Sequence, residues 1–182
     1  NLSTQSNRET NTKVNINQAG VMDATSYTPF TGSHLCLSKF QFQNINNLIE
    51  RNNLLEYADK EGYIVRSTGE IYNIDNSIDK TIPNINESLP VVELTNKVND
   101  TAIYGVIAGI NKNDKDLHRL IINSIGEGAL MVTNYNGNIN NGDYLTSSPI
   151  QGIAMKQDND TLYSYTVGKS LTDENFENNT SS

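Results

Sequence analysis

The sequence predicts a mainly β domain, an antiparallel sandwich or barrel with one surface helix. Three observations support this prediction. Short runs of β-branched and aromatic residues recur at even spacing over the second half of the chain, turn residues separate these runs, and the period of an amphipathic helix occurs convincingly once. This pattern favours antiparallel strands over a βαβ sheet, in which helices alternate with strands.

The composition bounds the size of the domain and the class of its partners. The chain has 182 residues, of which 36% are hydrophobic, so one modest core with ragged ends is expected. Its formal net charge is −8 and its pI is near 4.7, which repels phosphate backbones and anionic lipid headgroups. No apolar run approaches the ~20 residues of a membrane span. We therefore expect neither nucleic acid nor membrane insertion.

The metal-binding side chains are few. Cys36 is the single cysteine, which excludes an intrachain disulfide, and only His34 and His118 accompany it. A structural zinc site of the usual Cys and His type cannot be assembled from them. Residues 156–160, "KQDND", lack the oxygen spacing and the terminal glutamate of an EF-hand and are expected to form a solvated loop. The sequence predicts no metal and no cofactor.

The N-terminal part of the chain is expected to consist of a tail and the entrance to the domain. Residues 1–20 are polar, with Val14 and Ile16 alternating as in a short strand, and are expected to be a tail or a linker from a preceding region. Because the chain begins with Asn1 and not with methionine, we expect a processed piece of something longer. The domain is expected to span residues 21–176, with an ordered loop up to residue 32, a strand at 33–38, and a frayed end at 177–182.

A helix and a hairpin are predicted next. In residues 44–58 apolar side chains recur at spacings of three to four, which indicates a helix on the surface of a sheet, with Ile45, Leu48, Ile49 and Leu55 on its apolar face. Residues 63–74 are predicted to form a β-hairpin in which Ser67, Thr68 and Gly69 make the turn.

The remaining chain is predicted to be a series of short strands. They are expected at residues 90–95, 102–109, 117–125, 128–134, 143–147, 152–157 and 162–171. Between them, Gly137 and Gly142 lie in Asn-rich stretches and are predicted to take positive φ in two successive turns, the second of which leads into the strand at 143–147. Neither glycine is followed by a Lys-Ser/Thr pair or a helix start, so a phosphate loop is not predicted.

His34 and Cys36 are two residues apart, so in a strand their side chains point to the same face. One interpretation is a nucleophile with its base. The favoured interpretation is a small buried thiol beside a partly buried imidazole, because neighbours at i and i+2 on one strand seldom hold catalytic hydrogen-bond geometry.

Two serines and a glutamate are further candidates. Ser26 and Ser33 lie in or next to the loop before this strand, where a strained hydroxyl activated by His34 could attack its own backbone carbonyl. Most loop serines only satisfy backbone groups, which is the alternative here. Glu127 lies between two glycines and could act as a general base, but a turn cap is the favoured interpretation.

An ordered set of phrases in the sequence is more specific than any single motif. It comprises "IVRSTGEIYN", "INESLPVVELTN", "AIYGVIAG", "LIINSIGEGALMVTNYNGNINNGDYLTSS", "GIAMKQDND" and "LYSYTVGKSLTDENF". This order resembles the autocleaving intramolecular-chaperone domain of peptidase family G-two, in the glutamic-peptidase grouping. That domain is found at the C-terminus of phage neck-appendage and tail-spike proteins and in related fibre-like proteins of large DNA viruses. The resemblance covers roughly residues 24–176.

The resemblance implies a domain that trimerises at the end of an elongated fibre and helps the preceding β-helical or fibrous part to fold in register. A trimeric knob raises the local concentration of three long chains before they associate along their length. The resemblance also implies that the domain cuts itself away near its own N-terminal boundary.

The boundary itself departs from the pattern of the family. In the phage members an acidic Asp-Tyr-Ala-Glu stretch follows a serine, and its carboxylates assist the cut. The counterpart here is "SYTPF", in which Tyr27 matches the tyrosine while Ser26, Thr28 and Pro29 replace the neighbouring residues. The glutamate has no counterpart, and Asp23 lies upstream.

Three functions follow, in order of preference. The first is a C-terminal chaperone and trimerisation domain of a viral fibre or appendage protein, located in the virion or the assembling virion in the host cell. Its partners are two further copies of itself and the preceding fibre segment, and any cut is expected between Asp23 and Ser33, with Ser26 as nucleophile and His34 as base. The second is a non-cleaving head whose Tyr-rich loops contact a surface glycan or protein receptor. The third, a free-standing soluble enzyme, is weakest, since no nucleotide loop, metal cluster or complete triad occurs in the sequence.

Overall fold

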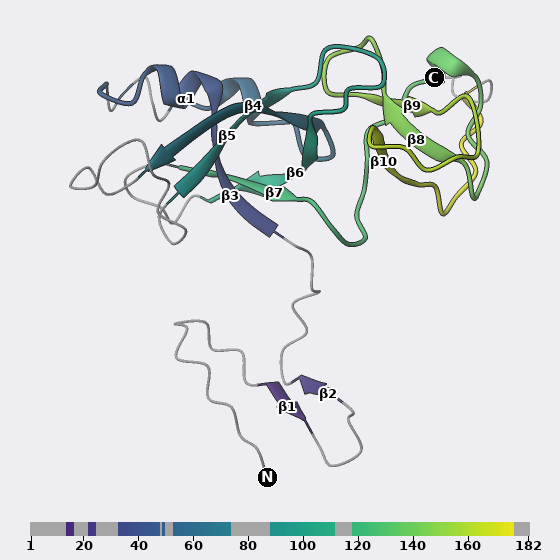
Figure 1. The fold of residues 1–182 in the computed structure, drawn as a ribbon, viewed down its shortest axis with the longest axis horizontal. Helices are drawn as coiled ribbons and strands as arrows, with labels where there is room; N and C mark the ends of the chain where they lie inside the picture. The colour runs from purple at the N-terminus through teal and green to yellow at the C-terminus, as the bar shows by residue number, and fades with distance from the viewer. Residues whose placement is uncertain are drawn as a thin grey trace. The chain divides into compact units, whose positions relative to one another are not determined.

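The computed structural model describes residues 33–47, 49, 53–73, 88–111 and 118–176, together with the backbone of residues 14–16 and 22–24. The chain divides into two compact units, Asn1–Thr31 and Gly32–Ser182. In the first unit β1 (Val14–Ile16) pairs antiparallel with β2 (Met22–Ala24). The second unit contains a closed five-stranded barrel and a three-stranded sheet (Figure 1). The prediction of a mainly β fold is therefore confirmed, and of the two predicted architectures the barrel is the one that forms.

The barrel is closed by its first strand. Its strands are β3 (Ser33–Ser38), β4 (Ile64–Asn73), β5 (Ser88–Leu94), β6 (Ile103–Ile110) and β7 (Leu120–Asn123), arranged in the order β3-β5-β4-β6-β7. The first four residues of β3 pair antiparallel with β7, and its last two pair parallel with β5. All other neighbours in the barrel are antiparallel. Because β3 has a partner on each side, it joins the two edges of what would otherwise be an open sheet.

The barrel has one apolar core. Side chains from all five strands and from the segment after the helix form it: Cys36, Leu54, Tyr57, Val65, Val92, Leu94, Ile107, Leu120 and Ile122. A second, smaller cluster lies outside the barrel, where Leu37 and Leu89 pack with Leu35, Ile45 and Tyr72. Successive side chains of a strand point to opposite faces, which explains why Cys36 and Leu37, both fully buried, belong to different clusters.

The predicted hairpin at 63–74 is wrong, because β4 runs through the expected turn as one strand. Its pairing with β5 shifts between Ser67 and Ile71, which is the mark of a bulge. The Ser67 hydroxyl accepts the N–H of Gly69 at 3.1 Å, and the Thr68 hydroxyl accepts the N–H of Glu70 at 3.2 Å. The turn-forming residues therefore make a local irregularity in a long strand and do not reverse the chain.

The helix predicted at 44–58 does not form as one element, although Ile49, inside this range, is helical. The helix α1 (Lys39–Gln43) begins five residues earlier and ends at Asn44. Ser38 and Gln41 form a capping box, in which the Ser38 hydroxyl accepts the Gln41 N–H and the Gln41 side chain accepts the Ser38 N–H. A short 3-10 helix, Leu55–Tyr57, follows later. Ile49 and Leu55, expected on the buried face, are 83% and 81% exposed.

The three-stranded sheet follows the barrel. It consists of β8 (Tyr144–Ser147), β9 (Ala154–Lys156) and β10 (Thr166–Lys169) in the order β10-β8-β9, as predicted from three of the apolar runs. The strand predicted at 128–134 is wrong, since only Val132 makes a bridge there, to Ala154. The two predicted glycine turns are confirmed: Gly137, after the 3-10 helix Asn134–Asn136, has φ +87°, and Gly142, just before β8, has φ +95°.

Backbone hydrogen bonds join the sheet to the barrel. Gly152, in the turn before β9, donates to the Thr95 carbonyl at 2.8 Å and accepts the Ile64 N–H at 2.7 Å. An ideal Cβ at Gly152 would lie 2.7 Å from the Tyr63 ring, so this close approach requires glycine. Met131 also donates to the Gly62 carbonyl at 2.9 Å. These bonds make the barrel and the sheet one packed body.

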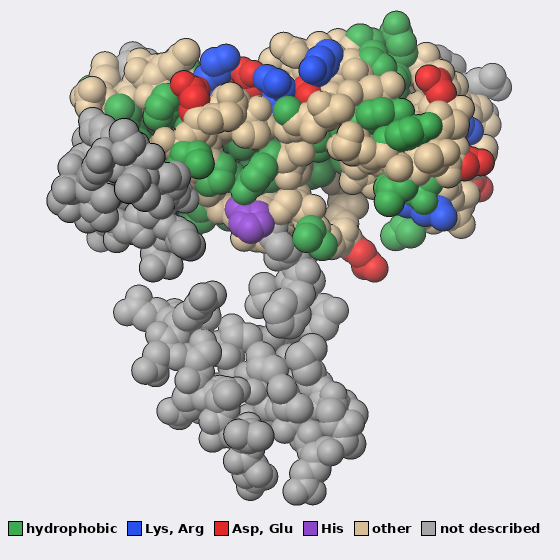
Figure 2. Space-filling view, in the orientation of Figure 1, with side chains coloured by type: hydrophobic (Ala, Val, Ile, Leu, Met, Phe, Trp, Pro, Cys, Tyr) green, Lys and Arg blue, Asp and Glu red, His purple; other side chains and the backbone are tan. Residues whose placement is uncertain are grey.

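Large hydrophobic side chains also lie on the outside of the second unit. On the face shown in Figure 2 they gather in one group over the barrel and another over the three-stranded sheet. The most exposed are Ile49, Leu55, Ile125, Leu162 and Leu171. Within the described segments, no helix is both long and apolar enough to cross a membrane.

Candidate functional site

The predicted base, His34, lies in the first half of β3, where it pairs with Ile122 of β7. Its side chain is exposed, which corrects the expectation of a partly buried imidazole. The ring centroids of His34 and Tyr104 are 6.0 Å apart, at an interplanar angle of 60°. His34 is therefore accessible to a reacting group from solvent.

Cys36 has the opposite environment. It is fully buried in the barrel core, and its Sγ lies 4.0 Å from the backbone oxygen of His34. Desolvation raises the pKa of the Cys36 thiol to about 12, although a hydrogen bond with Tyr104 partly offsets the rise. Because the thiolate is the reactive form, this thiol is not a nucleophile near neutral pH. The structural interpretation of Cys36 is confirmed.

Of the two serine candidates, the structure describes Ser33 but not Ser26. Ser26 lies outside the described residues, so its pairing with His34 stays a prediction. Ser33 begins β3, and its hydroxyl donates to the Asn123 side-chain oxygen at 2.6 Å. This bond joins the first residue of β3 to the last of β7, which gives Ser33 a structural role at the barrel seam.

The other candidates show no assembled chemistry. Glu127 is exposed between Gly126 and Gly128, just after a bend at Ile125 and Gly126. The solvated loop predicted at 156–160 is confirmed only for Asp158, Asn159 and Asp160, since Lys156 lies in β9 and Gln157 is buried. Among the residues that the structure describes, no three His, Cys, Asp or Glu side chains are grouped in a way that could hold a metal ion.

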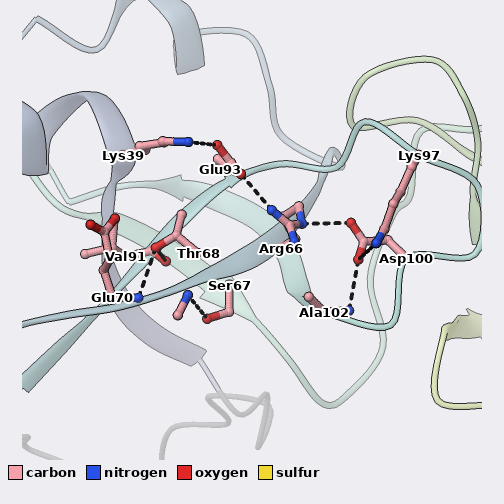
Figure 3. A network of polar contacts seen from close by, with 11 residues as sticks. Lys39, Arg66, Ser67, Thr68, Glu70, Val91, Glu93, Lys97, Asp100 and Ala102 are labelled. Atoms are coloured by element: carbon pink, nitrogen blue, oxygen red, sulfur yellow. Dashed lines mark hydrogen bonds and ion pairs between the residues drawn. The ribbon is translucent and has the colours of Figure 1, made fainter.

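A charged network that was not predicted crosses the barrel (Figure 3). Glu93 on β5 pairs with Lys39 of α1 and with Arg66 of β4, each at 2.8 Å. Arg66 Nε lies 2.8 Å from Asp100 Oδ2, and Lys97 lies 3.6 Å from the other oxygen of the same carboxylate. Asp100 is fully buried, while the lysines are at the exposed ends of the network.

The network links the barrel to the sheet. The Asp100 carboxylate also accepts the Ala102 N–H at 2.9 Å, and the Asp100 N–H donates to the Ser147 hydroxyl of β8 at 2.9 Å. The hydrogen bond from Lys39, with help from Arg66, lowers the pKa of Glu93. Every charged member has an opposite charge beside it, and through Asp100 the network helps to position the two sheets.

Sequence reasoning missed a second feature, the loop between β9 and β10. Tyr163 and Tyr165 stack there with ring centroids 4.8 Å apart and an interplanar angle of 19°. Leu162, beside them, is 70% exposed, and Tyr163 is 40% exposed. We call residues 157–166 the tyrosine loop. The tyrosines were predicted as part of a strand at 162–171, whereas β10 begins only at Thr166.

Known proteins add no further guide to this site, since a comparison of the chain with protein-family models, curated proteins and solved structures found no match.

Proposed function

We propose that this chain is a C-terminal intramolecular chaperone and trimerisation domain of a viral fibre or appendage protein, which releases itself by a cut between Asp23 and Ser33. The observation that carries the proposal is the division of the chain. The boundary between its two compact units falls between Thr31 and Gly32, inside the segment expected to be cut. A cut anywhere between Asp23 and Ser33 leaves every strand of the barrel intact, because β3 begins at Ser33.

The exposed apolar side chains support self-association. Five large aliphatic residues are more than two-thirds exposed on a domain whose net charge is strongly negative, and apolar surface of this kind is covered at protein interfaces. Within a fibre, three copies of the domain hold three upstream chains together, which lowers the entropic cost of bringing those chains into register. The domain then acts in the assembling virion.

The cleavage chemistry assigns roles to two residues. The Ser26 oxygen attacks a neighbouring backbone carbonyl, His34 takes the hydroxyl proton, and the departing amide nitrogen receives it. The ester that forms is then hydrolysed by water, which leaves a carboxylate and a new N-terminus. The exposure of His34 and the inertness of Cys36 are consistent with this assignment.

The test uses this chain with its upstream sequence, followed by intact mass spectrometry and light scattering. We expect a trimeric precursor and a new N-terminus between residues 24 and 33, and loss of cutting in Ser26→Ala and in His34→Ala. Ser33→Ala is the matched control, because its hydroxyl is engaged by Asn123. A Ser26→Ala chain that cuts at the normal rate would remove Ser26 from the mechanism, and a monomeric precursor would contradict the whole proposal.

A second candidate function is a non-cleaving head that binds a surface receptor. The tyrosine loop favours it, because a stacked and partly exposed aromatic pair is a typical contact surface. An intact trimer that persists after prolonged incubation would favour this candidate over self-release.

A further inference from the structure

The tyrosine loop holds apolar side chains in solvent on a rigid frame. The frame is built around Gln157, whose side chain is buried. Its Nε2 donates to the backbone oxygens of Asn159 and Thr161 at 2.8 and 2.7 Å, and its Oε1 accepts the Thr166 hydroxyl proton at 2.7 Å. The amide group of Gln157 thereby fixes the loop from both ends.

Further bonds set the position of the two rings. The Tyr163 N–H donates to the Thr166 hydroxyl at 3.0 Å, and the Thr166 N–H returns to the Tyr163 carbonyl at 3.1 Å. The Thr146 hydroxyl of β8 donates to the Tyr165 carbonyl at 3.1 Å. The main chain of Tyr163 is therefore tied to Thr166 at the start of β10, and the carbonyl of Tyr165 is tied to β8. A surface whose side chains are already ordered loses little further conformational entropy on binding.

The chemistry of the loop fits a neutral sugar ring. A phenol ring offers a flat apolar face and a polar edge, and the C–H face of a pyranose stacks on such a face while its hydroxyls form hydrogen bonds at the rim. Asp158, Asn159 and Asp160 are exposed in the same loop and supply carboxylate and amide groups. Asp158 is held by a 2.7 Å hydrogen bond from Asn136.

The charge of the protein narrows the class of sugar. The two carboxylates of the loop are part of a net charge of −8 on the chain, so acidic saccharides are repelled while uncharged ones are not. A lone cation would be attracted by the charge, but it would not need the broad apolar surface that Leu162 and Tyr163 present together.

We propose that the tyrosine loop is a binding site for a neutral saccharide, with the exposed Tyr163 ring as its stacking platform and Asp158, Asn159 and Asp160 as the hydrogen-bonding rim. This inference rests on the second candidate function, a receptor-binding head, and gives that head a ligand class. It is independent of Ser26 and of self-cleavage.

The test is ligand-observed saturation-transfer NMR on the full chain, with the methyl glycosides of glucose, galactose, mannose and N-acetylglucosamine as probes. We expect transfer to the ring protons of at least one glycoside. Tyr163→Phe keeps the ring and the binding, whereas Tyr163→Leu keeps apolar area but loses the ring, and weakens binding by about two- to tenfold. Leu171→Ala, which removes a more exposed apolar side chain outside the loop, leaves binding unchanged.

Two controls separate loss of sugar binding from loss of folding and from loss of assembly. Circular dichroism and thermal unfolding show whether each variant is folded, and light scattering reports trimerisation separately, so failure of the sugar site and failure of the proposed assembly are distinguishable. Absence of transfer to all four glycosides from the folded wild-type chain overturns the inference. Equal binding by Tyr163→Leu and wild type overturns it as well, and so does binding of a lysine-rich peptide in place of every sugar.

Discussion

The barrel and the three-stranded sheet are packed in different ways, although both are small β structures in one compact unit. The barrel encloses a continuous apolar cluster of nine buried residues. In the sheet and the loops beside it the buried apolar residues are Ile139, Leu145, Ala154 and Met155, and they share the interior with four buried polar residues, Thr146, Ser147, Ser148 and Gln157.

The buried polar residues hold their own region together through specific bonds. Ser148 accepts and donates within its turn, with its hydroxyl 2.7 Å from the Ile153 oxygen, and Ser147 accepts from Asp100 across the junction. Apolar burial depends on area and volume and tolerates some rearrangement, while each hydrogen bond demands one partner in one place. The comparison teaches that the barrel supplies most of the stability, and that the sheet supplies the fixed geometry that the tyrosine loop needs.

The largest expected effect is in the barrel. Ile107→Ala removes a fully buried side chain from the centre of the apolar cluster, and we expect the free energy of unfolding to fall by about 2–5 kcal/mol. Ile125→Ala is the matched control, because Ile125 is exposed, and it should change stability by less than about 0.5 kcal/mol. Urea denaturation measures both. Equal losses in the two variants would contradict the claim that the core cluster dominates.

A smaller and more local effect is expected in the sheet. Gln157→Leu keeps the buried volume but leaves the Asn159 and Thr161 carbonyls and the Thr166 hydroxyl without their partner, at a cost of about 1–2 kcal/mol. Hydrogen exchange should quicken at the Tyr163 and Thr166 amides and stay unchanged at barrel amides. Gln151→Leu, at an exposed position, is the control. Loss of protection throughout the barrel would mean that the two regions do not differ as described.

The smallest expected effect concerns the charged network that joins the regions. The pKa of Glu93 is lowered in the folded chain from its ordinary 4.5, so its carboxylate contributes stability above that pH, and the contribution is lost as the pH falls through the folded value. Glu93→Gln should therefore lower stability at pH 7 by less than about 1 kcal/mol, since Lys39 and Glu93 are partly exposed. The difference from wild type should vanish in acid. Glu127→Gln, at an exposed position outside the network, is the control for the substitution itself. A constant Glu93→Gln difference down to pH 2 would contradict the assignment.

The strands were predictable where a local pattern decides the structure. Residues 33–38 form the expected strand without any shift, and Gly137 and Gly142 adopt the expected positive φ. Predictions were wrong where one sequence pattern fits two different structures. A Ser-Thr-Gly triplet suits a turn and a bulge equally, and the sequence alone does not say that Val91 lies opposite Thr68, whose hydroxyl donates to its carbonyl.

The helix, the ion pairs and the tyrosine loop were predicted less well than the strands. The spacing of Ser38 and Gln41 in the sequence fits a capping box, but the helix was predicted from the apolar spacing of residues 44–58, which placed it too late in the chain. The ion pairs join residues from different strands, and the frame of the tyrosine loop depends on the burial of Gln157, which was predicted as part of a solvated loop. The residues near His34 in the sequence made it a candidate base. Its exposure could not be predicted, because it depends on where the barrel ends.

The double pairing of β3 has a consequence for the order in which the chain matures. Ser33 bonds to Asn123, 90 residues away, so the barrel cannot close until most of the domain has left the ribosome. Contacts of such long sequence separation slow folding. β3, the first strand of the barrel, therefore completes its pairing only after β7, the last strand, has been synthesised. Any process that requires a finished barrel is thereby delayed until the chain has been synthesised past Asn123.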